Sequence, residues 1–172
     1  MPSVDELNRL PEDAVRQDLR GCCSSDRWIV AVAAGRPYAD EAGLLAASDA
    51  AVAGMSEADL GDALAGHPRI GDRRVEASPG SWSGQEQAGV RGADDGLRQA
   101  LDDGNAEYER RFGHIYLACA TGRSAAELLA LLRERLGNDR ETEWSVVASE
   151  LAKINRLRLR KLIGAGSSKA SR

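Results

Sequence analysis

The sequence is poor in aromatic residues, which make up 4% of its 172 positions and include a single Phe. A core with few rings has to pack small and aliphatic side chains closely, and the abundant Ala and Leu favour helices. No segment shows the apolar–polar alternation of a strand, and there is no internal repeat. The chain is long enough for one domain with a real core. The composition therefore predicts an all-α fold, a single-domain bundle of about eight short helices.

Long apolar runs and concentrated positive charge are also missing. No apolar run approaches the ~18 residues of a membrane span, and no signal peptide is recognisable. We therefore expect a cytoplasmic protein with no membrane partner. The net charge is −4, and Lys and Arg gather only in the last predicted helix. This pattern argues against a nucleic acid partner.

The sequence also lacks the spacings that hold metals, disulfides or nucleotides. Cys22, Cys23 and Cys119 form neither a CxxC pair nor an even-numbered set, so we expect no zinc site and no disulfide framework. The two histidines, His67 and His114, lie far apart with no HxH or HExxH spacing, which predicts no metal site. Glycine-rich phosphate loops are absent.

Capping residues and glycine or proline stops divide the chain into predicted helices. Their ranges are 3–8, 11–19, 24–35, 40–53, 56–67, 83–92, 94–111, 124–136 and 140–163. Residues 68–80 form the longest irregular stretch, and a loop of this length inside a domain is often functional. Residues 112–120 fit either a buried helix or a short extended segment. The helical domain is expected to span 1–163, followed by a disordered Gly-, Ser- and Lys-rich tail over 164–172.

The hexapeptide His67-Pro68-Arg69-Ile70-Gly71-Asp72 follows a predicted helix that Gly66 ends. Because Pro68 restricts the backbone of the residue before it, His67 should leave the helix in a fixed, extended conformation. A histidine aimed by rigid neighbours suits acid/base chemistry. On this hexapeptide alone, however, a loop histidine that merely ends a helix is the better interpretation.

The last predicted helix carries an arginine on its apolar face. The apolar stripe consists of Trp144, Val147, Ala148, Leu151, Ile154 and Leu162. Arg158 follows Ile154 by four residues, so it falls on the same stripe, whereas Arg156 and Arg160 are rotated away from it. An inward guanidinium needs an anionic partner. An internal salt bridge is at least as good an explanation as a ligand.

Three further residues have structural and functional interpretations. Ser83-x-x-Glu86 matches a helix capping box, which is the better explanation of Glu86 from sequence alone. The functional alternative is that Ser83, Glu86 and Gln87 present polar groups at a helix N-terminus. His114 is best explained as a packed or hydrogen-bonded core residue. Cys119 is most simply a small buried residue.

Taken together, several motifs resemble the family of 2-oxo-4-hydroxy-4-carboxy-5-ureidoimidazoline (OHCU) decarboxylases over roughly residues 4–163. The most specific pair is His67-Pro68-x-Ile70-Gly71 followed by Ser83-x-x-Glu86-Gln87. The other matching segments are Leu7-Asn8, Gly21-Cys22-Cys23-Ser24-Ser25-Asp26-Arg27-Trp28, Arg36-Pro37-Tyr38, Asn105-Ala106-x-Tyr108-x-x-x-Phe112-Gly113 and Lys153-Ile154-x-x-Leu157-Arg158-Leu159. One departure is His114, at a position where many members carry an apolar residue.

The resemblance implies an all-α, cofactor-free and homodimeric protein whose small-molecule substrate is OHCU. It implies catalytic roles for His67, Glu86 and Arg158. It further implies substrate contacts from Pro68, Ser83, Gln85, Glu86, Gln87, Ile115, Tyr116, Leu117, Ala118, Cys119 and Arg158.

The implied reaction is decarboxylation of OHCU to (S)-allantoin and CO2 in urate degradation. We expect His67 to act as general acid/base, because an ordinary histidine pKa of about 6.5 suits proton transfer near neutral pH. Glu86 would orient the substrate or His67, and Arg158 would bind anionic oxygens. Two alternatives are a lyase or hydrolase acting on a related ureide or imidazoline, and a non-catalytic ureide-binding module.

Overall fold

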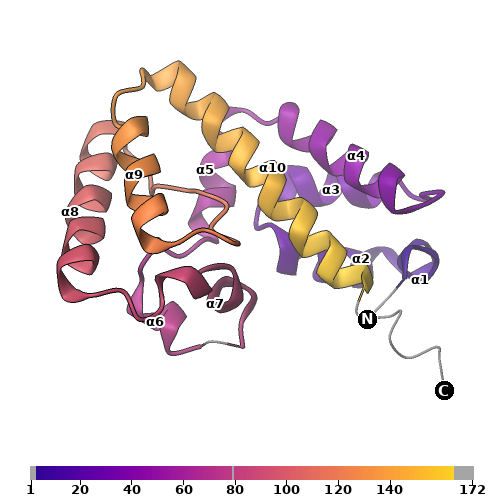
Figure 1. The fold of residues 1–172 in the computed structure, drawn as a ribbon. Coiled ribbons are helices and arrows are strands. Elements are labelled where there is room, and N and C mark those ends of the chain that lie inside the picture. The colour runs from indigo at the N-terminus through magenta and orange to yellow at the C-terminus, as the bar shows by residue number, and fades with distance from the viewer. Residues whose placement is uncertain (1–2, 79, 165–172) are drawn as a thin grey trace. The chain divides into compact units, whose positions relative to one another are not determined.

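The computed structural model describes residues 3–78 and 80–164, which fold into helices and connecting segments with no strand among them (Figure 1). The all-α prediction is confirmed. The described residues form ten α-helices and one 3-10 helix. Their bounds are α1 Val4–Arg9, α2 Glu12–Cys22, α3 Asp26–Ala34, α4 Glu41–Ala53, α5 Glu57–Ala65, α6 Arg73–Glu76, α7 Trp82–Glu86, η1 Ala88–Val90, α8 Asp95–Phe112, α9 Ala125–Arg135 and α10 Arg140–Gly164.

Most helices begin where capping residues predict. The side chains of Ser3, Ser56 and Ser124 each close a capping box with the acidic residue three positions later. Asp40 and Asp94 cap α4 and α8 with one side-chain hydrogen bond each. Local hydrogen-bond chemistry therefore sets these helix starts, independently of the tertiary packing.

Some predicted boundaries are wrong. The helix predicted over 11–19 continues to Cys22 in α2. Residues 68–80 are not wholly irregular, because Asp72 caps the single-turn helix α6 through a bond from the Arg74 N–H. The predicted helix over 83–92 is instead α7 followed by η1. These short pieces raise the helix number above eight.

The contacts within the chain divide it into two compact units. The first comprises residues up to Gly66 and those from Leu151, and the second comprises His67–Glu150. Helix α10 therefore contributes residues to both. No helix among the described residues is long and apolar enough to cross a membrane. Gly164 is the last residue of α10, and the rest of the predicted tail lies outside the described residues.

In the first unit, α3 packs against α2 and α4. The buried indole of Trp28 donates to the Ser48 hydroxyl across 3.2 Å, which joins α3 to α4 inside the core. The buried hydroxyl of Tyr38 donates to the Val32 carbonyl at the end of α3. The Trp28 indole and the Tyr38 hydroxyl thus both find partners within this apolar core.

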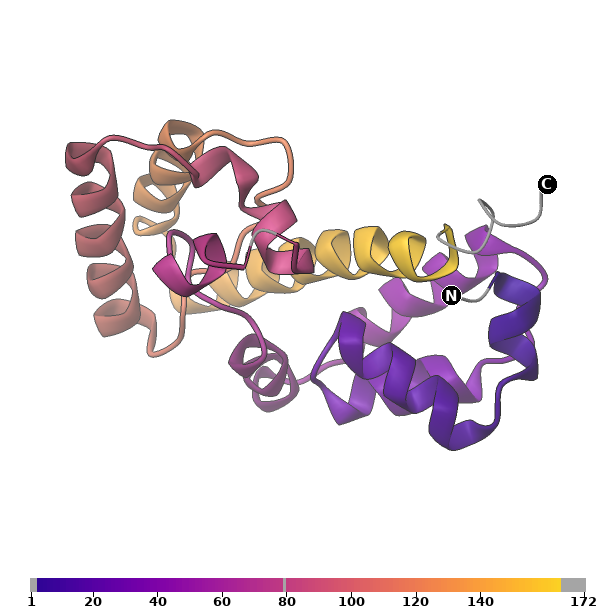
Figure 2. The same ribbon diagram turned by 90° about the horizontal axis from the view of Figure 1, so that it is seen from below.

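In the second unit, α8 and α9 lie side by side in both views (Figures 1 and 2). Gly104 in α8 faces α9, because a Cβ there would lie 3.0 Å from a terminal methyl of Leu132. The absence of a side chain at Gly104 therefore permits the close approach of α8 and α9. The connection from Gly113 to Ser124 contains neither helix nor strand, so the buried-helix alternative for 112–120 is wrong.

A buried ion pair joins α9 to α10 within the second unit. The Arg135 guanidinium contacts the Glu143 carboxylate, and their side chains are only 3% and 0% exposed. The Tyr108 hydroxyl of α8 also donates to Glu143, and the Asn138 amide donates to its other oxygen. Three helices therefore meet at one carboxylate.

We predict that Glu143→Ala lowers the free energy of unfolding by about 3–5 kcal/mol, because it leaves Arg135 buried without its carboxylate. Urea denaturation followed by circular dichroism measures this change. Arg20→Ala is the control: its pair with Asp26 is exposed on both sides and should cost less than about 1 kcal/mol. Equal effects of the two substitutions would contradict this account.

The three tyrosines predict an unusual alkaline titration. Burial raises the pKa of Tyr38, Tyr108 and Tyr116, and for Tyr108 the hydrogen bond to Glu143 raises the pKa further. The folded chain therefore retains tyrosine protons that the unfolded chain loses near pH ~10. Stability must fall as the pH rises above that value.

We expect tyrosinate absorbance to appear in one step together with unfolding, and not gradually around pH ~10. Ultraviolet absorbance and circular dichroism recorded on the same samples test this. Tyrosine ionisation in a chain that keeps its full helix signal would show that the rings are accessible.

Candidate functional site

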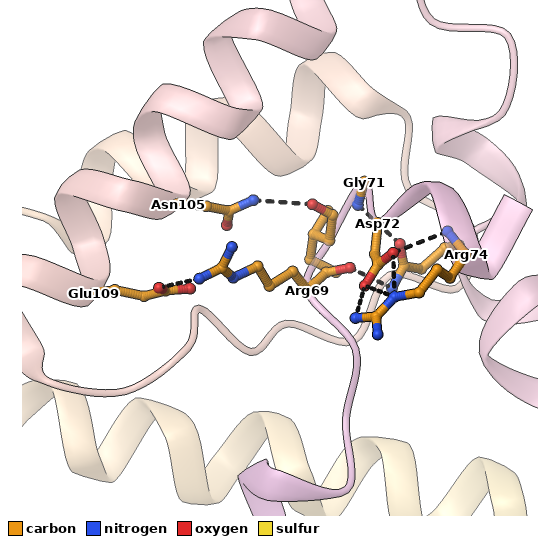
Figure 3. Close-up of polar contacts among 8 residues, drawn as sticks. Arg69, Gly71, Asp72, Arg74, Asn105 and Glu109 are labelled. Carbon is orange, nitrogen blue, oxygen red and sulfur yellow. Dashed lines mark hydrogen bonds and ion pairs between the residues drawn. The ribbon is translucent and has the colours of Figure 1, made fainter.

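The loop that carries His67 is held by side chains from two helical segments. The carboxamide of Gln87 accepts from the Gly71 N–H at 2.9 Å and donates to the Arg69 carbonyl at 3.1 Å. The buried amide of Asn105 in α8 donates to the Ile70 carbonyl at 2.9 Å (Figure 3). Both peptide groups between Arg69 and Gly71 are therefore bonded to buried amides. His67 itself is half-buried at the start of this loop.

Two arginines in and next to the loop form ion pairs with carboxylates (Figure 3). Arg69 pairs with Glu109 of α8 at 2.5 Å, and Arg74 pairs with Asp72 at 2.7 Å. The hydrogen bond from Arg74 lowers the pKa of the Asp72 carboxyl. A cavity of about 600 Å³ adjoins the loop, and its lining includes His67, Pro68 and Ile115.

The helix that carries Glu86 begins earlier than the sequence indicates. Ser81, and not Ser83, is its N-cap, with the Gly84 N–H donating to the Ser81 hydroxyl. Glu86 is the last residue of α7 and Gln87 is its C-cap. The capping-box explanation of Glu86 is therefore wrong. The alternative that Glu86 sits at a helix N-terminus is wrong as well, since it is the last residue of α7, whereas Gln87 is both the C-cap of α7 and the N-cap of η1.

A glycine lets this segment approach the 113–124 connection. A Cβ at Gly89 in η1 would lie 2.0 Å from the carbonyl oxygen of Arg123 and 3.0 Å from its carbonyl carbon. Because both are backbone atoms, no rotamer change could relieve the clash. Gly89 therefore allows η1 to pack directly on the loop before α9.

The five residues from Ile115 to Cys119 lack secondary structure, and charged side chains bind their backbone. Arg135 donates to the Leu117 carbonyl at 2.6 Å, and its guanidinium lies over the Tyr116 ring at 4.9 Å. The Glu150 carboxylate accepts from the Cys119 N–H at 2.7 Å. These contacts replace the ladder or helix bonds that such a buried segment would otherwise require.

The charges of two carboxylates affect the pKa of the Cys119 thiol. Burial raises its pKa, and the negative charges of Glu150 and Glu86 raise it further. Glu86 of α7 and Glu150 of α10 therefore both act on the same half-buried residue. Cys119 is partly exposed, so the prediction that it is simply a small buried residue is only partly right. All three cysteines are free thiols.

His114 is half-buried and packs against other rings, which agrees with the predicted packed position but not with full burial in the core. Its ring lies 4.3 Å from that of Trp144 and 5.5 Å from that of Tyr108. Its Nδ1 lies 3.0 Å from the Ile115 carbonyl oxygen. The ring thus stabilises the entry to the 115–119 segment.

Arg158 belongs to the first unit, where its side chain is buried on α10 as its position on the apolar stripe predicts. It donates to the Cys22 carbonyl at 3.1 Å. Its neighbours on α10 behave differently: Arg160 forms an exposed pair with Glu41, and Arg156 pairs with Asp49. The inward orientation is confirmed, and the role of Arg158 in a site remains a prediction.

The second unit thus connects three of the segments that the sequence singles out. Gln87 joins α7 to the His67 loop, Glu86 acts on Cys119, and His67 and Ile115 line one cavity. Sequence reasoning missed Glu150, Arg135 and Gly89. Asn105 lies in a motif that the family resemblance includes, and its function here is to hold the loop. No three metal-binding side chains converge among the described residues.

These features define an all-helical protein with a polar site built on irregular segments between short helices. The family model for OHCU decarboxylase matches residues 8–160. The 2-oxo-4-hydroxy-4-carboxy-5-ureidoimidazoline decarboxylase of Amia calva is 32% identical over 136 residues, covering 77% of this chain and 78% of that protein. The chain belongs to the OHCU decarboxylase family.

Other relatives agree. The uric acid degradation bifunctional protein TTL of Arabidopsis thaliana is 30% identical over 146 residues, covering 82% of this chain, which spans only 45% of that longer protein. A crystal structure of OHCU decarboxylase in the presence of (S)-allantoin superimposes with a TM-score of 0.71 at 25% identity. That match covers 86% of this chain and 97% of the solved one.

We predict that Gly89→Ala destabilises the protein by about 1–3 kcal/mol, because the new methyl group meets the Arg123 backbone. Gly61→Ala is the matched control in helix α5, where a Cβ meets nothing within 4 Å. Helix propensity should make that control more stable by roughly 0.5–1 kcal/mol. Opposite shifts in the thermal midpoint are expected; a neutral Gly89→Ala would contradict the close approach.

Proposed function

We propose that this protein decarboxylates OHCU, releasing CO2 and forming (S)-allantoin in urate degradation. The observation that carries the proposal is the connection of the His67 loop, the Glu86 segment and residues 115–119 within one compact unit. Membership in the OHCU decarboxylase family supports the substrate. The names of the relatives from Amia calva and Arabidopsis thaliana support the pathway.

The chemistry requires an electron sink and a proton donor. When the carboxylate leaves as CO2, the electron pair of the broken C–C bond passes into the adjacent imidazoline and must then be captured by a proton on one face. We assign general acid/base catalysis to His67. The bonded peptide groups of residues 69–71 hold the loop that follows it, which favours a fixed direction of proton delivery.

The other proposed residues bind or orient the substrate. Glu86 would accept hydrogen bonds from the ureido or hydroxyl group, and Arg158 would pair with anionic oxygens. Pro68, Ser83 and Gln85 would contact the substrate. So would Gln87, whose carboxamide also holds the His67 loop. The remaining proposed contacts come from Ile115, Tyr116, Leu117, Ala118 and Cys119.

We predict that His67→Ala reduces the rate of decarboxylation by about 10²–10⁴-fold, the usual contribution of a positioned acid or base. The substrate is generated in place by oxidising urate with urate oxidase and adding 5-hydroxyisourate hydrolase. Circular dichroism then follows the appearance of (S)-allantoin. His67→Asn should be as slow as His67→Ala. Asparagine can still form hydrogen bonds, but it cannot transfer a proton near neutral pH.

The outcomes separate the proposed activity from its rivals. Wild-type rates in both His67 variants would refute the acid/base assignment. Racemic product at the rate of spontaneous decay with the wild-type protein would refute the decarboxylase itself. In that case, turnover of another ureide or imidazoline would indicate a sister lyase or hydrolase, and tight binding without turnover would indicate a ureide-binding module.

We also propose that the protein is a homodimer in the cytoplasm, as the resemblance implies. Analytical ultracentrifugation of the full chain tests the dimer directly, and a sedimentation coefficient of the monomer at all concentrations would refute it.

A further inference from the structure

The segment 115–119 raises a question that the proposed catalytic residues do not answer. It lacks the helix or strand bonds that would hold its backbone, although Tyr116, Leu117 and Ala118 are buried. Its conformation must therefore depend on side chains from other elements. Two of these side chains are charged and come from the helices on which the segment packs.

Glu150 is the less expected of the two. It lies on α10 as the last residue of the second unit, and it is only 5% exposed. Its Oε2 accepts from the Cys119 N–H at 2.7 Å, the short distance of a charge-assisted bond. Burying a carboxylate costs free energy, so a carboxylate retained at this position indicates that the contact matters.

Arg135 is the complementary anchor. Its Nη1 donates to the Leu117 carbonyl at 2.6 Å, two residues before the amide that Glu150 binds. The Arg135 cation binds the carbonyl of the 117–118 peptide group, and the Glu150 anion binds the N–H of the 118–119 peptide group. Both peptide groups are therefore fixed. The intervening Ala118 is thereby held from both sides.

We propose that Glu150 is a positioning residue that places the 117–119 backbone against the substrate by accepting the Cys119 N–H. This inference rests on the proposed function, because the substrate contact of the segment is part of it. The positioning role depends on whether the side-chain oxygen of residue 150 reaches the Cys119 N–H. A neutral oxygen at the same distance should therefore serve nearly as well.

Two substitutions test separately the length and the charge of the Glu150 side chain. Glu150→Gln keeps the length of the side chain and an acceptor oxygen but removes the charge, whereas Glu150→Asp keeps the charge and shortens the reach by one methylene. Glu107→Gln is the matched control, since Glu107 is an exposed carboxylate on α8 in the same unit. Thermal melts of all three variants establish that they are folded before activity is measured.

We expect Glu150→Asp to lower kcat by about 10–100-fold with a much smaller change in KM, because a displacement of about 1 Å can cost about 10²-fold. Glu150→Gln should retain kcat within several-fold of the wild type. When the enzyme concentrations are adjusted so that Glu150→Asp and the wild type form product at the same rate, the product of Glu150→Asp should also contain a smaller excess of (S)-allantoin than the wild-type product. A merely structural role would lower the thermal midpoint without moving these readouts.

Alkylation of Cys119 by iodoacetamide tests the geometry without any catalytic assay. Cys22 and Cys23 are buried, so the folded protein should react at Cys119. Burial, Glu150 and Glu86 all raise the pKa of that thiol, so Glu150→Gln should lower the pKa and accelerate alkylation at a fixed pH. Glu107→Gln should leave the alkylation rate unchanged.

The outcomes are distinct. Wild-type kcat in Glu150→Asp, or an inactive Glu150→Gln beside an active Glu150→Asp, would overturn the positioning role. Unchanged alkylation in Glu150→Gln would contradict the proximity of Glu150 to Cys119 whatever the activity. Failure of the proposed function would appear differently, as a wild-type protein that alkylates as expected but does not accelerate decarboxylation.

Discussion

The carboxamide of Gln87 is the interaction on which the arrangement of the second unit depends. Its oxygen and nitrogen bond to the backbone on both sides of Ile70, so one buried side chain ties the end of α7 to the His67 loop. A carboxamide suits this task because it carries a donor and an acceptor on one rigid plane. A carboxylate or a cation could satisfy only one of the two peptide groups.

The same physical problem recurs throughout the unit. Irregular backbone has no regular helix or strand bonds, and buried N–H and C=O groups that its turns leave unpaired must find side-chain partners. Asn105 bonds to Ile70, Arg135 to Leu117 and Glu150 to Cys119, each from a helix. The helices thus act as a rigid frame that holds the loops by long-range polar contacts.

Stability and function draw on overlapping residues here. Arg135 belongs to the buried ion pair with Glu143, and the same guanidinium binds the Leu117 carbonyl. Burial alone would lower the pKa of Arg135, but the hydrogen bond and the charge of Glu143, together with Tyr108 and Tyr116, outweigh burial and raise the pKa. The arginine therefore stays charged, which keeps the anchor of the 115–119 segment strong.

The sequence by itself determined the all-α class, most helix starts and the inward position of Arg158. Capping boxes at Ser3, Ser56 and Ser124 involve residues only three positions apart, and the stripe of α10 follows from helical periodicity. The ordered motifs around His67 and Glu86 also identified the family. Only the tertiary structure decided that Gln87 holds the His67 loop and that Glu150 binds Cys119. Those contacts join residues 16–31 positions apart, and no local pattern encodes such pairings.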